Sequence, residues 1–138
     1  VFIPLDFSFR EKVWRPAQSS LVTDFPIIFT GFVHHLAPEE ILAEKIRAIL
    51  TRKKGRDFFD LWFLLSKGVS FDQDLVKKKM SYYPRVVWNK DLLAEKINQF
   101  SLKEFILDLR PFLSLPERTK IGELYALAKE TILKKLFS

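Results

Sequence analysis

Apolar residues recur with the period of an α-helix through residues 39 to 65, and this stretch organises the rest of the chain. At about 100° per residue, Leu42, Ile46 and Ile49 form the centre of an apolar stripe. The opposite face of this predicted helix is polar, and we expect water to solvate its side chains: Glu40, Glu44, Arg47 and Thr51. The stripe predicts a helix packed on one side against a core.

Two cations interrupt the apolar stripe, and two carboxylates follow on the next predicted helix. Lys45 and Arg52 fall inside the stripe, where a plain helical hairpin would carry apolar side chains. After a short basic turn, an almost entirely apolar helix carries Asp57 and Asp60, which share one face because they are three positions apart. Burying an unpaired charge costs on the order of several kcal/mol. We therefore expect these four side chains to meet one another, a ligand, or both.

The N-terminal part alternates with the period of a β-strand. Residues 1 to 9 place Leu5, Phe7 and Phe9 on one side, so that Asp6 points to the other side. A second extended segment is predicted at residues 26 to 35, after a loop that contains Pro16 and the pair Ser19-Ser20. The chain opens on Val1 within the first predicted strand, which resembles a truncated start. Two strands alone are marginal in water, so we expect them to belong to a larger sheet.

Helix start signals dominate the chain beyond residue 65. The S-x-x-E/Q capping pattern begins at Ser70, Ser101 and Ser114, and Asn89 is placed to cap another helix. Pro116 is expected to open a last helix that runs to the C-terminus. The predicted fold class is α+β: about two strands at residues 1–36 and a mainly helical domain of about six helices at residues 37–138.

The charged pattern has a specific resemblance. The run Glu-Glu-Ile-Leu-Ala-Glu-Lys-Ile-Arg-Ala from Glu39, then Arg52, then Arg56-Asp57-x-x-Asp60, resembles the signature of the AbiEii family of nucleotidyltransferase toxins. This family falls in the DNA polymerase beta-like nucleotidyltransferase superfamily. The resemblance extends upstream to Leu5-Asp6-Phe7 and to Phe9-Arg10-Glu11, and more weakly through the later helices.

The resemblance implies transfer of a nucleotidyl group from an NTP with Mg²⁺. It implies catalytic roles for Lys45, Asp57, Asp60 and Asp6, nucleotide binding by Lys45, Arg52 and Arg56, and metal binding by Asp6. In the family, a Gly-Ser turn followed by an Asp-x-Asp pair lies upstream of the strand that carries Asp6, and that combination is not found in the 138 residues. The chain therefore resembles the C-terminal part of such an enzyme, which we expect to be inactive alone.

The resemblance also implies partners and a setting. Relatives act as toxins of toxin-antitoxin or phage-defence systems, so a cognate antitoxin is expected to be encoded beside this chain, without the two proteins needing to bind. Transfer RNA is the acceptor of some relatives, so the resemblance implies transfer RNA or another nucleic acid as the acceptor. Unpaired edges of the two predicted strands would favour a homo-oligomer.

The amino-acid composition limits the classes of protein to which this chain can belong. The chain has 138 residues, of which 48% are hydrophobic and 29% charged, so it can bury one core. It has no cysteine, no apolar run near the roughly 18 residues of a membrane span and no secretory start, so we expect a cytoplasmic protein. The net charge of +6 suits a polyanionic partner.

The same residues are also consistent with a non-catalytic function. In it, the chain is a helical module whose charged cluster fixes packing and whose basic surface binds nucleic acid or a protein. The run Lys77-Lys78-Lys79 is expected to be solvated, and with the basic turn at residues 52 to 56 it would form that surface.

Overall fold

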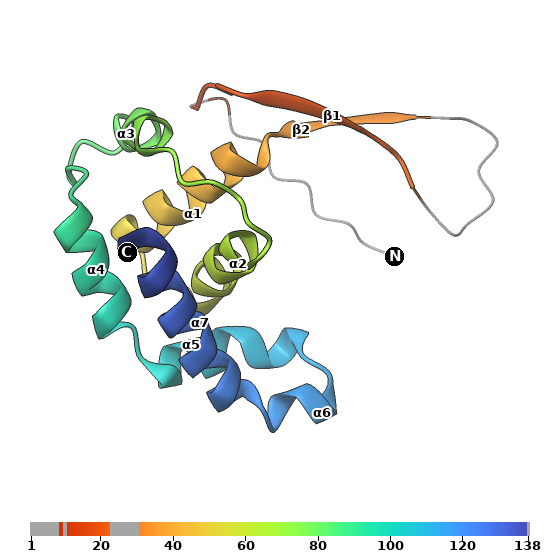
Figure 1. The fold of residues 1–138 in the computed structure, drawn as a ribbon, viewed down its shortest axis with the longest axis vertical. Coiled ribbons are helices and arrows are strands. Elements are labelled where there is room, and N and C mark those ends of the chain that lie inside the picture. The colour runs from red at the N-terminus through yellow and green to blue at the C-terminus, as the bar shows by residue number, and fades with distance from the viewer. Residues whose placement is uncertain (1–8, 10, 23–30, 138) are drawn as a thin grey trace.

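A two-stranded hairpin followed by helices makes up the computed structural model, which describes residues 9, 11–22 and 31–137 (Figure 1). The strands are β1 (Pro16–Ser20) and β2 (Phe32–Leu36). The helices are α1 (Pro38–Thr51), α2 (Gly55–Ser66), α3 (Gln73–Met80), α4 (Lys90–Gln99), α5 (Leu102–Leu109), the 3₁₀ turn η1 (Arg110–Phe112), α6 (Leu115–Arg118) and α7 (Ile121–Phe137). The predicted α+β class is confirmed.

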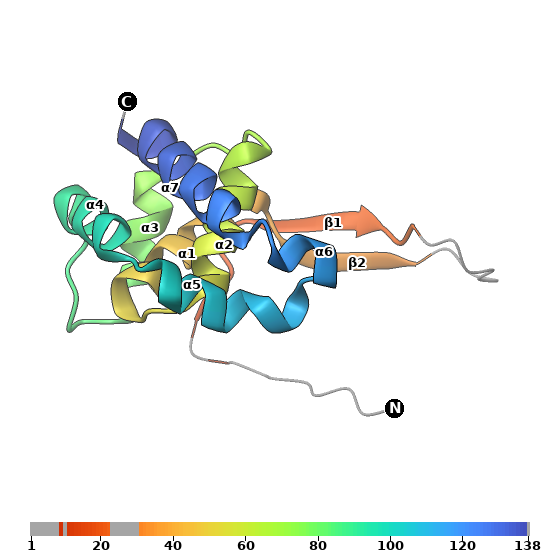
Figure 2. The ribbon, with the colours of Figure 1, turned by 90° about the horizontal axis from the view of Figure 1, so that it is seen from below.

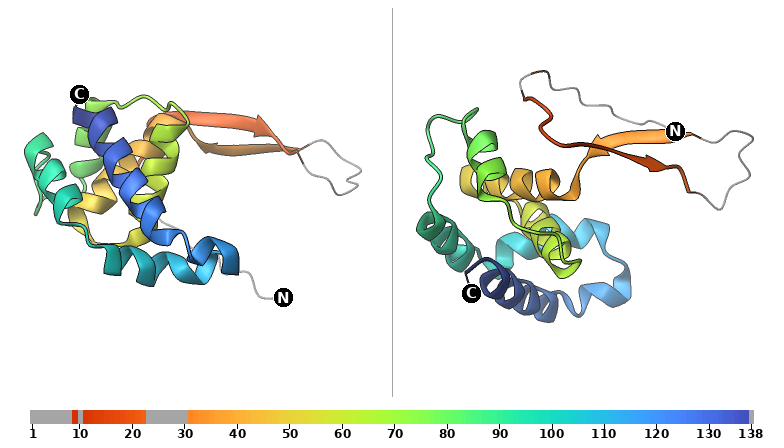
Figure 3. Two further views of the ribbon diagram at one scale, coloured as in Figure 1. Left: turned by 60° about the horizontal axis from the view of Figure 1, so that its bottom comes forward. Right: turned by 45° about the horizontal axis from the view of Figure 1, so that its top comes forward.

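The hairpin extends away from the helices, as Figures 1, 2 and 3 all show. Its strands are antiparallel, with Pro16 opposite Leu36 and Ser20 opposite Phe32. Across the pair, Ser19 Oγ lies 2.7 Å from Nε2 of His35. Most side chains on both strands are exposed, so backbone pairing holds this ribbon together more than apolar burial does.

The strand assignments made from the sequence need correction. The segment predicted as a loop around Pro16 and Ser19-Ser20 is β1. Its sequence lacks apolar alternation because neither face of the ribbon is buried, and alternation marks only a half-buried strand. The strand predicted at residues 1–9 lies outside the described residues except for Phe9, and residues 26–30 lie outside them too. Self-association through the sheet edge stays a prediction.

Helices α1 and α2 lie at the centre of the helical body (Figure 3). Helix α1 packs against α2, α3 and α4, and α2 also packs against α5 and α7. The ring of Phe58 in α2 stacks on Phe100 at 4.7 Å between centroids and meets Phe105 edge-on at 5.9 Å. The predicted apolar stripe of α1 is buried in this core.

Most predicted helix starts are observed. Asn89 caps α4, and Ser101 and Ser114 each form a capping box with the glutamate three residues later. The predicted box at Ser70 is wrong, because Asp72 accepts the first amides of α3 instead. Asp72 is the third residue of the predicted pattern that begins at Ser70. Its carboxylate accepts the hydrogen bonds that the Ser70 hydroxyl was expected to accept. The single last helix that was expected is two helices, α6 and α7.

The start of α2 depends on a contact with another helix. Its N-cap residue, Lys54, makes no side-chain cap, and the Gly55 amide instead donates to Oδ2 of Asp108 in α5 at 2.6 Å. A Cβ at Gly55 would lie 3.0 Å from Cα of Phe105 and 3.0 Å from Cβ of Asp108. Glycine is therefore required for α2 to approach α5 closely enough to be capped.

We expect Gly55→Ala to destabilise the protein by about 1 to 3 kcal/mol, because the backbone of α5 has to move away from the added methyl group. Urea denaturation would measure this. Gly122→Ala is the matched control, since a Cβ at Gly122 meets nothing within 4 Å in α7. The control should be neutral or stabilising by up to about 1 kcal/mol. Equal changes in the free energy of unfolding for the two variants would contradict the close approach of α2 to α5.

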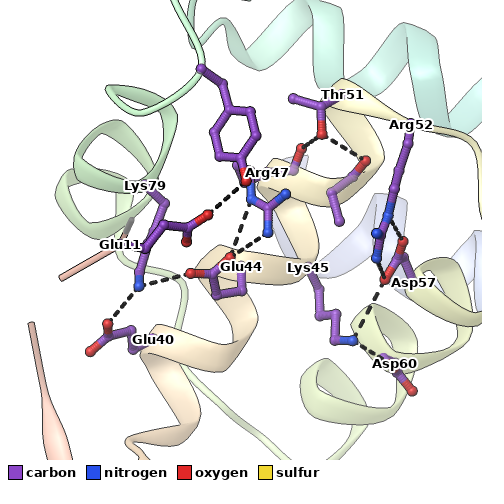
Figure 4. Close-up of polar contacts among 12 residues, drawn as sticks. Glu11, Glu40, Glu44, Lys45, Arg47, Thr51, Arg52, Asp57, Asp60 and Lys79 are labelled. Atoms are coloured by element: carbon purple, nitrogen blue, oxygen red, sulfur yellow. Dashed lines mark hydrogen bonds and ion pairs between the residues drawn. The ribbon is translucent and has the colours of Figure 1, made fainter. Parts of the chain in front are cut away.

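A buried ion cluster joins α1 to α3 (Figure 4). Nζ of Lys79 lies 2.7 Å from Oε1 of Glu40 and 2.8 Å from Oε1 of Glu44. Glu40 is 0% exposed and Lys79 is 2% exposed. The expectation that water solvates Glu40 and Lys79 is therefore wrong, and Glu44, whose side chain is 17% exposed, is solvated only in part. Helix α3 covers this face of α1, which periodicity within α1 cannot reveal.

Glu40 and Lys79 also hold the segment that leads into β1. The backbone amides of Trp14 and Arg15 donate to the Glu40 carboxylate, and Lys79 donates to the carbonyl oxygen of Lys12 at 3.3 Å. Burial by itself raises the pKa of Glu40, but the hydrogen bonds from Lys79 and the two amides outweigh it and hold that pKa below 4.5. The cluster thus fixes the base of the hairpin against α1 and α3.

We expect Lys79→Met to cost about 3 to 5 kcal/mol at neutral pH, because it leaves two carboxylates without their buried cation. Urea denaturation measures the loss. The matched control is Lys77→Met. The Lys77 side chain is 54% exposed, and its ion pair with Asp74, at 3.5 Å, is also exposed to water. The effect of Lys77→Met should stay within about 0.5 kcal/mol.

Acid should reduce the difference in free energy of unfolding between Lys79→Met and the wild type. The folded-state pKa of Glu40 lies below its ordinary 4.5, so its contribution to stability is complete above 4.5 and is lost as pH falls through the folded value. In Lys79→Met the carboxylate protonates more easily, which relieves the buried charge. If the difference in free energy of unfolding stays constant from neutral pH to a pH of about 3, this account is contradicted.

Candidate functional site

Four charged side chains from α1, its C-terminal turn and α2 converge on the other side of α1 (Figure 4). Nζ of Lys45 lies 2.7 Å from Oδ2 of Asp60 and 3.6 Å from Oδ1 of Asp57. Arg52 donates from Nε to Oδ2 of Asp57 at 2.7 Å and from Nη2 to Oδ1 at 3.0 Å. The convergence expected from the charge pattern is present.

Burial differs sharply within the cluster. The Asp57 side chain is 4% exposed, whereas that of Asp60 is 41% exposed. Lys45 is 26% exposed and Arg52 56%. The hydrogen bond to Asp57 raises the pKa of Arg52 above its ordinary value and outweighs burial, which lowers it. Asp57 is thus a buried anchor, while the other three charges reach water.

The cluster lines a pocket of about 260 Å³ between the end of α1 and the start of α2. The lining consists of four cations and two carboxylates: Lys45, Arg52, Lys54, Arg56, Asp57 and Asp60. Positive charge therefore exceeds negative charge in the pocket, which suits an anionic ligand such as a phosphate. Lys54 was not among the nucleotide-binding residues that the resemblance implies, although it belongs to the basic turn at residues 52 to 56 that was expected to contribute to a polyanion-binding surface.

Arg56 is placed differently from the other cations of the pocket. Its guanidinium lies 5.5 Å from the ring centroid of Phe112, and it makes no ion pair with a described residue. Arg56 is exposed, so its donors are available to a ligand.

The predicted metal ligand is not among the described residues. Asp6 is outside the described residues, so its metal-binding and catalytic roles stay predictions. An Asp-x-Asp spacing occurs at Asp72-Gln73-Asp74, but Asp72 caps α3 and pairs with Arg15 at 2.5 Å. This pair is a helix start, without the Gly-Ser turn that precedes the family's carboxylates.

Magnesium does not fit the residues that the structure describes. Within ranges 9, 11–22 and 31–137, no group of three or more His, Asp or Glu side chains is placed to hold a metal ion. Both oxygens of Asp57 are already bonded to Arg52, and one oxygen of Asp60 is paired with Lys45. Hard divalent cations need several free oxygen ligands.

The structure thus defines a mainly helical α+β protein with a cationic, carboxylate-bearing pocket at the junction of its two central helices. The model of one family, described as nucleotidyl transferase AbiEii toxin of type IV toxin-antitoxin systems, matches residues 1–133. The match covers nearly the whole chain, so the chain belongs to the AbiEii family. No curated protein and no solved structure matches it. Over the part of the chain that the structure describes, no helix has the length and apolarity to cross a membrane.

We expect Lys45→Met to cost less than about 1 kcal/mol, because Asp60 is partly solvated and Asp57 keeps its two bonds to Arg52. Arg52→Met should cost more, about 1 to 3 kcal/mol, since it leaves the buried Asp57 with only the distant Lys45. Arg56→Met is the matched arginine control and should stay within about 0.5 kcal/mol. Urea denaturation of the three variants is the measurement, and a Lys45→Met penalty above that of Arg52→Met would make Lys45 the structural member of the cluster.

Proposed function

We propose that this protein transfers a nucleotidyl group from an NTP to an acceptor hydroxyl, and that the pocket between α1 and α2 receives the triphosphate. The observation that carries the proposal is the excess of cations around two carboxylates in a solvent-open pocket. Membership of a family of nucleotidyl transferase toxins supports it.

Lys45 has the geometry of a cation that stabilises charge on the phosphates. Its Nζ lies between Asp57 and Asp60 and its side chain is 26% exposed, so a phosphate oxygen can approach it from the pocket. A fixed cation beside the pyrophosphate leaving group lowers the energy of the charge that develops there. Arg52, Lys54 and Arg56 would bind the remaining phosphate oxygens.

The two carboxylates divide into different roles. Asp57 is buried and bonded through both oxygens, so we assign it the task of orienting Lys45 and Arg52. Asp60 pairs with Lys45 through Oδ2 and is 41% exposed. We assign Asp60 the role of general base that accepts the proton of the acceptor hydroxyl, because its side chain is 41% exposed whereas that of Asp57 is 4% exposed.

Magnesium and the acceptor extend the same proposal. The described residues leave too few free oxygens for Mg²⁺, so we assign metal binding to Asp6 and to no described residue. A net charge of +6 supports a nucleic acid such as transfer RNA as acceptor. The family's place in type IV toxin-antitoxin systems implies an antitoxin as genetic partner.

We expect Lys45→Met and Asp60→Asn to lose at least about 100-fold in nucleotidyl transfer while keeping their folded structure, because each removes a group that acts on the reacting atoms. The assay follows label from each of the four α-³²P NTPs into total RNA with the full-length protein. Lys103→Met is the matched control, since Lys103 is exposed on α5 and outside the pocket.

The outcomes separate the two functions considered for this chain. Loss of transfer in both pocket variants but not in Lys103→Met supports the enzyme. Full transfer by folded Lys45→Met would make the cluster architectural. Binding of RNA with no transfer of any of the four labels would leave the non-catalytic module standing.

A further inference from the structure

An apolar slot adjoins the charged pocket. It has a volume of about 310 Å³ and is lined by Arg56, Phe59, Asp60, Leu109, Phe112 and Leu113. Arg56 and Asp60 line both the slot and the charged pocket, so the two openings meet at these side chains. A ligand that is anionic at one end and flat and apolar at the other would fill both.

Phe112 gives the slot an exposed aromatic wall. Its side chain lies in the 3₁₀ turn η1 and is 67% exposed, so its ring is accessible to a ligand. The guanidinium of Arg56 lies 5.5 Å from its ring centroid. An exposed ring beside a cation is the arrangement that stacks a nucleobase and holds its phosphates.

The turn that presents Phe112 is held on both sides. Pro111 fixes the backbone at the start of η1, and the Leu113 amide donates to the carbonyl of Arg110 at 3.4 Å. After the turn, Nε of Arg118 donates to the carbonyl of Leu113 at 3.1 Å. The ring is therefore presented from a constrained segment, which reduces the entropy lost when a ligand stacks on it.

We propose that this slot binds the nucleobase of the NTP whose triphosphate lies in the charged pocket. The inference rests on the proposed function and adds a base subsite to it, formed by Phe112, Arg56 and the apolar side chains of Phe59, Leu109 and Leu113. Because the lining is apolar apart from Arg56 and Asp60, the affinity of the slot for a nucleobase increases with the area of the base that stacks in it. Purine nucleotides bind more tightly than pyrimidine nucleotides.

NMR titration of the full-length protein tests the base subsite, with ATP, CTP and inorganic tripolyphosphate as probes, each with Mg²⁺. ATP should bind more tightly than tripolyphosphate, and ring-current shifts at Phe112 should accompany ATP and CTP but not tripolyphosphate. Phe112→Ala should weaken ATP about tenfold and leave tripolyphosphate within about twofold. Phe32→Ala is the matched control, because Phe32 is 65% exposed on β2, close to the exposure of Phe112, and lines neither opening.

A second variant separates failure of the subsite from failure of the proposed function. Lys45→Met should weaken all three probes together, because it removes a phosphate contact. If Lys45→Met weakens them and Phe112→Ala changes none, the base subsite is wrong and the phosphate pocket stands. If ATP binds no more tightly than tripolyphosphate, the subsite is also wrong. If neither variant alters ATP binding, both the subsite and the pocket are overturned.

Discussion

Charges on helix α1 that are removed from water govern how the neighbouring segments pack against it. Glu40 is removed completely from water, and its negative charge is tolerated because Lys79 and two backbone amides bond to it. Those partners come from α3 and from the segment before β1. One buried carboxylate therefore fixes both the packing of α3 on α1 and the direction in which the hairpin leaves the helical body.

The second cluster on α1 uses the same chemistry for a different result. Asp57 is as well bonded as Glu40, but its partners Arg52 and Lys45 stay partly in water. A charge that keeps access to solvent can exchange its partner for a ligand at small cost, whereas the Glu40 cluster cannot. The contrast in burial between the two sides of one helix is what distinguishes a structural ion cluster from a candidate site.

The position of α2 connects this site to the remainder of the helical body. The helix starts where Asp108 of α5 caps Gly55, and that contact sets where Asp57 and Asp60 stand relative to Lys45. The same α5 leads into η1, which places Phe112 in the apolar slot beside the pocket. The cations of the pocket and an exposed aromatic ring are thus brought together by helix packing, from segments more than fifty residues apart in the chain.

The order of residues was enough to predict the helical stripe of α1, the convergence of Lys45 and Arg52 on Asp57 and Asp60, and the caps at Asn89, Ser101 and Ser114. These follow from local periodicity and from hydrogen bonds between residues close in the chain. The packing of α3 on α1 was needed to show that Glu40 and Lys79 are paired out of water with Glu44 beside them, because α3 covers a face that α1 alone shows as polar. The tertiary structure likewise decided that Pro16–Ser20 is a strand and that Phe112 adjoins the pocket. Pairing and packing between distant segments set these features, and no period within either segment encodes them.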